Sequence, residues 1–134
     1  MSANPTAFVT DTHALYWYLI ADKRLSKRAK AAFDEAAQGR AYVYLPAIVI
    51  SEFYYLNIKL GSRLDFAEAM REFQTSAQFR FVAFEAIDAL DFDRDAQVPE
   101  MHDRIIVGVA RRLNAALLTH DTQIVASGLV QTIW

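Results

Sequence analysis

Short apolar runs alternate along this chain with longer stretches in which apolar residues recur at helical spacing. The apolar runs predict buried strands, at residues 7–10, 41–45, 79–84, 115–119 and 130–133. The longer stretches predict helices, at residues 11–21, 27–38, 46–60, 66–74 and 103–113, with shorter ones at 85–92 and 121–126. Residues 93–102, which contain Pro99, are expected to form a loop.

Capping residues mark several of these boundaries. Ser26 and Asp65 stand where the second and fourth helices should begin, and both residue types are favoured N-caps. Gly39, Gly61 and Asn114 follow predicted helices and readily adopt the left-handed backbone that ends a helix. Strands that alternate with helices in this way are typical of an α/β fold with a largely parallel sheet.

The composition narrows the possible functions. The 134 residues are 54% hydrophobic, which suits a single domain spanning residues 1–134. The net charge of −2, from 14 Lys and Arg against 16 Asp and Glu, excludes a strongly basic surface overall but allows a local basic patch. The chain has no cysteine, which excludes disulfides, thiolate zinc sites and cysteine nucleophiles.

No targeting or membrane segment is expected. Residues 1–10 lack the basic start and apolar centre of a signal peptide. The apolar run at 45–50, like every other in the chain, is far shorter than the ~18 residues that a membrane span needs. Together with the absence of cysteine, this pattern favours a cytoplasmic protein that does not contact membranes.

Acidic residues stand at informative places along the predicted elements. Asp11 follows the first strand and Asp121 follows the fourth, and ligands of parallel sheets bind beyond the carboxyl ends of strands. Each could instead serve only as an N-cap. Glu52 lies four residues after Ile48 and four before Leu56, so it is in phase with an apolar stripe, where an unpaired carboxylate would be costly.

Asp103 stands at the start of a predicted helix, where the helix dipole favours a negative charge even without a ligand. If it gathers with the other three acids, two carboxylates ~4 Å apart repel by ~4 kcal/mol at an effective dielectric of 20. Such a cluster requires a cation, and a site made only of carboxylates suits Mg²⁺ or Mn²⁺. The chain has neither a G-x-S-x-G nucleophile motif nor a glycine-rich phosphate loop.

Four sequence blocks contain these acids. They are FVTDTHAL at 8–15, PAIVISE at 46–52, DRIIVGVA at 103–110 and ALLTHD at 116–121. In their order and spacing they resemble PIN domains, especially the VapC-like toxins of type II toxin–antitoxin systems, over nearly the whole chain. In that pattern the family's acids fall on Asp11, Glu52, Asp103 and Asp121, and a hydroxyl two residues before the last acid falls on Thr119.

The resemblance implies a three-layer α/β/α fold around a mainly parallel sheet of four to five strands. It also implies an endoribonuclease that uses Mg²⁺ or Mn²⁺ and that a cognate antitoxin holds inactive. RNA as the substrate rests on the resemblance alone. We expect a metal-activated water to attack the phosphodiester in line, leaving a 5′-phosphate and a 3′-hydroxyl.

Two alternatives remain open at this point. One is another metal-dependent enzyme, a phosphatase or a DNA nuclease, although Thr12 and His13 after Asp11 leave no Asp-x-Asp phosphatase motif. The other is a non-catalytic PIN-like binding module. Retention of all four acids argues against such a module, because a degenerate site has no reason to keep their mutual repulsion.

Other residues have weaker candidate roles. Many relatives carry Asp-Pro-Phe-Asp-Arg where this chain has EMHDR at 100–104, so Glu100 is either a supporting ligand or a solvated loop acid. Thr12 could hold a water molecule or cap a helix. Lys27, from the basic run at 23–30, and Arg104 are candidate RNA contacts or solvated surface charges.

Two groups of side chains are expected at the edges of the site and on the surface. The histidines are expected at the rim of the site rather than in its chemistry; they are His13, His102 and His120. Aromatic residues at 16–18 and 53–55 exceed what one core-facing stripe needs. Some of them are expected to form a homodimer or antitoxin-binding surface, with core packing as the alternative.

Overall fold

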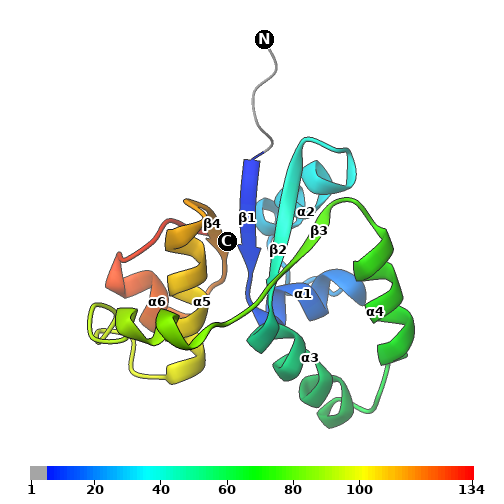
Figure 1. The fold of residues 1–134 in the computed structure, drawn as a ribbon. Helices are drawn as coiled ribbons and strands as arrows, with labels where there is room; N and C mark the ends of the chain where they lie inside the picture. Colours follow the sequence, from blue (N-terminus) through cyan, green and yellow to red (C-terminus); the bar gives the residue numbers. More distant parts are fainter. Residues whose placement is uncertain (1–5) are drawn as a thin grey trace.

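The computed structural model describes residues 6–134, so part of the segment 1–10, in which no signal peptide is expected, lies outside the described residues. Five parallel strands form one sheet in the order β3-β2-β1-β4-β5 (Figure 1). Their bounds are β1 Thr6–Thr10, β2 Ala41–Pro46, β3 Phe79–Val82, β4 Ala116–Leu118 and β5 Thr132–Ile133. The predicted parallel α/β architecture is confirmed.

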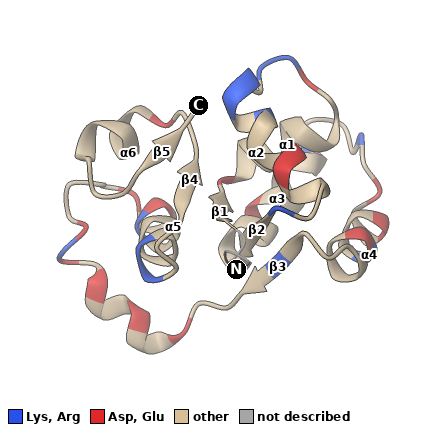
Figure 2. Cartoon of the chain, turned by 90° about the horizontal axis from the view of Figure 1, so that it is seen from above, with Lys and Arg blue, Asp and Glu red and all other residues tan. Residues whose placement is uncertain are grey.

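Helices cover both faces of this sheet. They are α1 Thr12–Leu19, α2 Lys27–Ala37, α3 Ala47–Lys59, α4 Phe66–Thr75, α5 Met101–Arg112 and α6 Thr122–Ser127. Helices α1 and α2 lie on one side, and α5 packs against β1 and β4 on the other (Figure 2). The result is the three-layer α/β/α arrangement. None of the helices within residues 6–134 has the length and apolar character that a bilayer crossing requires.

The caps that the sequence predicts are present. The Ser26 hydroxyl accepts a hydrogen bond from the Ala29 amide at 3.1 Å, and α2 begins at the next residue. The Asp65 carboxylate does the same for the start of α4. Gly39 and Asn114 have positive φ angles of 82° and 49°, so the chain turns out of α2 and α5 where expected.

Several predicted boundaries are wrong by a few residues. Helix α5 starts at Met101, inside the loop predicted at 93–102, because the Glu100 carboxylate accepts from the Asp103 amide at 2.9 Å and caps the helix. Glutamate is not among the favoured N-caps, so the cap residue is a weak signal for this boundary. The strand predicted at 79–84 ends at Val82, and the short helix predicted at 85–92 is a 3-10 helix, η1, spanning Ala86–Asp91.

The core lies between the sheet and the helices. It is built from aliphatic strand residues and from large side chains of the helices that are less than 2% exposed, among them Val9, Val43, Tyr16, Phe33, Phe53 and Ile106. One polar residue of α3 is also buried there. The Asn57 amide binds both backbone groups of Leu64, at 2.8 and 3.1 Å, which ties the end of α3 to the segment that leads into α4.

A buried ion pair fixes the long connection between β3 and α5. Asp95 is completely buried, and both of its carboxylate oxygens accept hydrogen bonds from the Arg111 guanidinium. Arg104 adds backbone bonds, donating to the carbonyls of Val98, Phe92 and Ala96. The connection is therefore held against α5, which carries Asp103.

We expect Asp95→Ala to lower the free energy of unfolding by about 3 kcal/mol, because it leaves the Arg111 guanidinium without its partner next to the core. Urea denaturation measures the change. The matched control is Asp93→Ala, an exposed carboxylate in the same connection, which should cost less than about 0.5 kcal/mol. Equal losses in the two variants would contradict a special role for the buried pair.

Candidate active site

The site lies at the point where the sheet order reverses. From β1 the chain continues through α1 and α2 to β2 on one side, whereas β4 pairs with the other side of β1. The Asp11 amide, just past β1, donates to the Leu118 carbonyl at the end of β4 at 3.1 Å. Crevices at such reversal points, beyond the carboxyl ends of the strands, are where open parallel sheets bind ligands.

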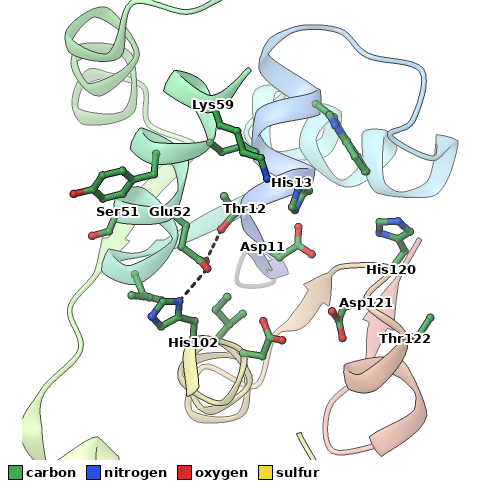
Figure 3. Close-up of a pocket in the computed structure, with 16 residues that line it drawn as sticks. Asp11, Thr12, His13, Ser51, Glu52, Lys59, His102, His120, Asp121 and Thr122 are labelled. Atoms are coloured by element: carbon green, nitrogen blue, oxygen red, sulfur yellow. Dashed lines mark hydrogen bonds and ion pairs between the residues drawn. The ribbon is translucent and has the colours of Figure 1, made fainter. Parts of the chain in front are cut away.

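A cavity of about 990 Å³ opens at this edge, and all four predicted acids line it. Asp11 follows β1, Glu52 lies on α3, Asp103 on α5 and Asp121 after β4. In Figure 3, Asp11, Glu52 and Asp121 point toward a common space from different elements. Folding therefore gathers side chains from four separate parts of the chain into one cavity.

Two of the acids are also helix caps. Asp11 Oδ1 accepts from the Ala14 amide at 2.8 Å and caps α1. Asp121 Oδ1 accepts from the Ile124 amide at 3.0 Å and caps α6. Each carboxylate has a second oxygen that no cap bond uses. Capping and ligand binding are therefore compatible here, since the cap bond fixes each carboxylate while leaving one oxygen for a ligand.

Glu52 is held by two side chains rather than left alone on the apolar stripe. Its Oε1 accepts from the Thr12 hydroxyl at 2.7 Å, and its Oε2 lies 3.1 Å from Nδ1 of His102 (Figure 3). Thr12 is buried, so this contact is part of the packed wall of the cavity. Of the predicted alternatives for Thr12, the structure shows a side chain that orients a carboxylate.

The face of α3 that carries Glu52 is not the one that packs into the core. Ile48, Glu52 and Leu56 line the cavity, whereas the buried stripe of α3 is Val49, Phe53 and Asn57. The prediction that Glu52 sits in a buried stripe is wrong in this respect. Both stripes of α3 are apolar, so helical periodicity alone does not select the one that faces the core.

Asp103 and Glu100 occupy the first turn of α5 but differ in what they face. Asp103 lines the cavity. Glu100 is exposed and does not line it; its Oε2 accepts the Asp103 amide, and its Oε1 lies 3.6 Å from Nδ1 of His102. Glu100 therefore supports the site through α5 and His102.

The acids weaken one another's ionisation. Burial raises the pKa of the Asp103 carboxyl to about 7, and neighbouring negative charges add to the increase. The carboxylates that contribute are, in decreasing order, those of Asp121, Glu100, Glu52 and Asp11. Burial also raises the pKa of Asp11, although hydrogen bonds with the Thr119 hydroxyl and the Ala14 amide oppose the change. The cavity is therefore a site of concentrated negative potential that a cation would relieve.

The donor set fits a hard divalent ion. Carboxylate oxygens from several elements face one space, and burial together with their mutual repulsion raises the pKa of Asp103. Within residues 6–134, however, no group of three or more Asp, Glu or His side chains is placed so that it could hold an ion. An ion would therefore need the free oxygens of these carboxylates to lie closer together than they do in this structure.

Sequence reasoning missed Lys59, which also lines the cavity (Figure 3). Lys59 lies seven residues after Glu52, two helical turns along the same face of α3, and that spacing could have found it. Among residues 6–134 it forms no ion pair. It is thus a free cation beside the carboxylates, in position to meet an anionic ligand.

The two predicted RNA contacts are placed differently. Lys27 is exposed at the start of α2 and does not line the cavity. The Arg104 guanidinium is occupied by backbone carbonyls of the β3–α5 connection. Arg104 therefore stabilises the fold in this structure, and the proposed contacts of both residues with RNA stay predictions.

The three histidines all line the cavity, as rim residues should. Thr119 is fully buried, and its hydroxyl accepts from the Asp121 amide at 3.1 Å, which fixes the turn that presents Asp121. Of the aromatic residues predicted at the surface, Tyr54 and Tyr55 are exposed, whereas Tyr16 and Phe53 belong to the core. The α3 surface is therefore the one left for contacts.

The family model described as the PIN domain matches residues 8–127, which include all four acids. The chain belongs to the PIN domain family. No curated protein sequence matches this PIN domain.

Solved structures show the same fold. This PIN domain is similar to VapBC2 from Rickettsia felis bound to a promoter DNA fragment, with 13% identity, 95% of this chain and 97% of that chain covered, and a TM-score of 0.66. FitAcB from Neisseria gonorrhoeae is 19% identical, with 93% of this chain and 95% of that chain covered and a TM-score of 0.64. VapBC-1 from nontypeable Haemophilus influenzae is 14% identical, with 95% of this chain and 96% of that chain covered and a TM-score of 0.63. At these identities the likeness establishes the fold.

Asp103→Asn should stabilise the metal-free PIN domain at pH 8 by about 1 kcal/mol, a value kept small because solvent reaches this carboxyl. The pKa of Asp103 is raised in the folded state, so the wild type loses stability as the pH rises from about 4 through about 7. The variant lacks this loss. Urea unfolding in EDTA between pH 4 and pH 8 measures it.

Asp93→Asn, at an exposed carboxylate away from the cavity, is the control and should show no such pH-dependent gain. Stabilisation by Asp103→Asn that is equal at pH 4 and pH 8 would contradict the raised pKa of Asp103 in the folded state.

Proposed function

We propose that this PIN domain is a metal-dependent endoribonuclease and the toxin component of a toxin–antitoxin pair. The observation that carries the proposal is the gathering of Asp11, Glu52, Asp103 and Asp121 in one cavity at the reversal point of the sheet. The proteins of this family are nucleases, and the four acids coincide with the family pattern in sequence. RNA as the substrate, and hence action in the cytoplasm, follows from the resemblance to the VapC-like toxins.

In this proposal the four acids hold Mg²⁺ or Mn²⁺. When bound, such an ion lowers the pKa of a water molecule and neutralises charge that develops on the phosphate. We expect Asp11 and Asp103 to be direct ligands, with Asp121 acting directly or through water. The raised pKa of Asp103 supports this assignment, because a carboxylate that repels its neighbours gains most from a nearby cation.

The remaining residues of the cavity position these acids. Thr12 and His102 each contact one oxygen of Glu52 and so orient its carboxylate. Thr119 contacts both Asp11 and the Asp121 amide, and so connects the acid after β1 with the one after β4. The catalytic geometry in this proposal is therefore set by hydroxyl groups that are buried in the wall of the cavity.

An RNA backbone meets an acidic cavity and needs cations to approach it. Lys59 is placed at the cavity itself, and Lys27 lies in the basic segment at the start of α2. Phosphate contacts of this kind position a strand without reading its sequence. We propose that these two lysines offset the repulsion between the carboxylates and the phosphates on either side of the cleaved bond.

The antitoxin partner is proposed from the similar structures. VapBC2, FitAcB and VapBC-1 share this fold, and the VapBC names match the VapC-like toxins that the sequence resembles. The exposed apolar side chains of α3 and of its C-cap residue provide a surface for an antitoxin or for a second copy of the chain; they include Tyr54, Tyr55, Ile58 and Leu60. A homodimer remains part of the proposal on the same grounds.

Asp11→Asn should reduce RNA cleavage by about 100-fold or more, because it removes a charge from the proposed metal ligands. The fold should survive, since asparagine is as good an N-cap as aspartate and can still accept the Ala14 amide. Cleavage of total RNA in Mg²⁺ or Mn²⁺ measures activity, and the products should carry 5′-phosphates.

Asp65→Asn is the matched control, because Asp65 caps α4 by the same kind of bond but does not line the cavity. It should keep full activity. Independently of cleavage, Mn²⁺ should raise the melting temperature of the wild type and of Asp65→Asn, and raise that of Asp11→Asn less. Undiminished cleavage by Asp11→Asn would remove this residue from the mechanism.

Expression of the wild-type chain in bacteria should arrest growth if the nuclease is a toxin. Asp11→Asn should relieve the arrest, and Asp65→Asn should not. The measurement is colony formation after induction at matched protein levels. Harmless expression of a wild-type protein that cleaves RNA in vitro would contradict the toxin assignment and leave the nuclease assignment intact.

A further inference from the structure

A second cavity, of about 470 Å³, opens beside the carboxylate cavity. The two share His120 and Thr122 as a common wall, so they meet next to Asp121. The second cavity extends away from the acids toward α2 and β5, where Arg28 and Trp134 line it. A polymer that places one bond at the acids can therefore continue into this second cavity.

An aromatic stack forms part of the wall. The imidazole of His120 lies on the indole of Trp134 with ring centroids 4.5 Å apart and planes 17° from parallel. Trp17 packs behind both rings, with centroids 5.5 Å from His120 and 5.8 Å from Trp134. Because Trp17 is only 7% exposed, it backs the stack as part of the core. The cavity thus offers flat aromatic surfaces in a fixed orientation.

An unpaired guanidinium stands opposite this stack. Arg28 is exposed in the first turn of α2, and within residues 6–134 it forms no ion pair. Arg24, by contrast, is paired with Asp22 at 2.9 Å. Figure 2 shows the basic start of α2, in blue, across from the end of β5. The second cavity therefore combines an aromatic surface with a cation that is free to bind an anion.

We propose that this second cavity is a subsite for one unpaired nucleotide of single-stranded RNA, adjacent to the bond that is cleaved. The base stacks on the His120–Trp134 pair, and Arg28 binds a neighbouring phosphate. Stacking on aromatic side chains together with cations along the backbone is how proteins hold single-stranded RNA. The inference rests on the proposed nuclease function, which it extends by assigning residues that select unpaired RNA.

The combination of groups favours a nucleotide over a peptide. An acidic peptide would bind the Arg28 guanidinium, but its acidic side chains would not stack on the His120–Trp134 pair beside it. A nucleotide supplies an aromatic base and an anion on the same unit, at a spacing of a few ångströms. Because the subsite meets the acids at His120, an occupant there would place its own backbone at the carboxylates.

Tryptophan fluorescence can test the subsite, because the chain has only two tryptophans and Trp17 is buried. The full chain carrying Asp11→Asn, in Mg²⁺, is titrated with a short single-stranded oligoadenylate. We expect saturable quenching of the tryptophan emission, and most of this quenching should be lost in the same chain carrying Trp134→Phe. An oligomer of equal length with an abasic ribose–phosphate backbone should bind more weakly and quench much less.

Variants separate stacking from charge in the same background. Trp134→Ala should weaken binding of the fluorescently labelled oligoadenylate about tenfold by anisotropy, whereas Trp134→Phe keeps a ring and should lose less. Arg28→Ala should weaken the binding of base-bearing and abasic oligomers alike and lower the salt dependence by about one phosphate contact. Arg80→Ala, an exposed arginine on the strand at the opposite edge of the sheet, is the control and should bind as the parent does.

Equal affinity for oligoadenylate and the abasic oligomer would overturn the subsite, as would unchanged binding by a folded Trp134→Ala or Arg28→Ala variant. Either result would overturn the subsite even if the wild type cleaves RNA. Base-dependent quenching by a chain whose wild type cleaves no RNA would support the subsite and reject the proposed nuclease function. The two ideas therefore fail on different measurements.

Discussion

The pairing of β1 with β4 is the constraint on which the site depends. Parallel hydrogen bonds between these strands continue past their ends, since the Asp11 amide donates to the Leu118 carbonyl. This places Asp11 and Asp121, more than a hundred residues apart in the sequence, at one edge of the sheet. The backbone pairing and the core behind it hold the acids together against their repulsion. Burial of Asp103, together with the negative charges beside it, raises the pKa of its carboxyl to about 7.

The same side chains shape the helices and the cavity. Asp11 and Asp121 each use one oxygen as an N-cap, and Glu100 caps the helix on which Asp103 lies. A cap bond fixes a carboxylate at a helix N-terminus, where the helix dipole also favours its charge. A structural role therefore does not compete with a ligand role at these positions. The cap restrains each side chain, and the cavity receives the oxygen that remains.

Residues outside the cavity hold the segment packed against α5, the helix from which Asp103 faces the cavity. The Asp95–Arg111 pair and the backbone bonds of Arg104 hold the connection between β3 and α5 against α5 itself. Arginine serves here as a structural residue because its planar group binds several oxygens at once. Cations that remain available to an anionic ligand, Lys59 and Arg28, lie instead on helices that border the two cavities.

The sequence alone determined the order of strands and helices, most of their caps, and the acids that stand at their ends. These features are local, because periodicity, cap chemistry and turn residues act over a few positions. The tertiary structure decided that the cavity, rather than the core, receives Glu52, and it brought Lys59 and the His120–Trp134 stack to the same edge. Helix α3 is apolar on two stripes, so only packing against its neighbours could choose between them. Contacts between distant segments depend on strand pairing, which no local pattern encodes.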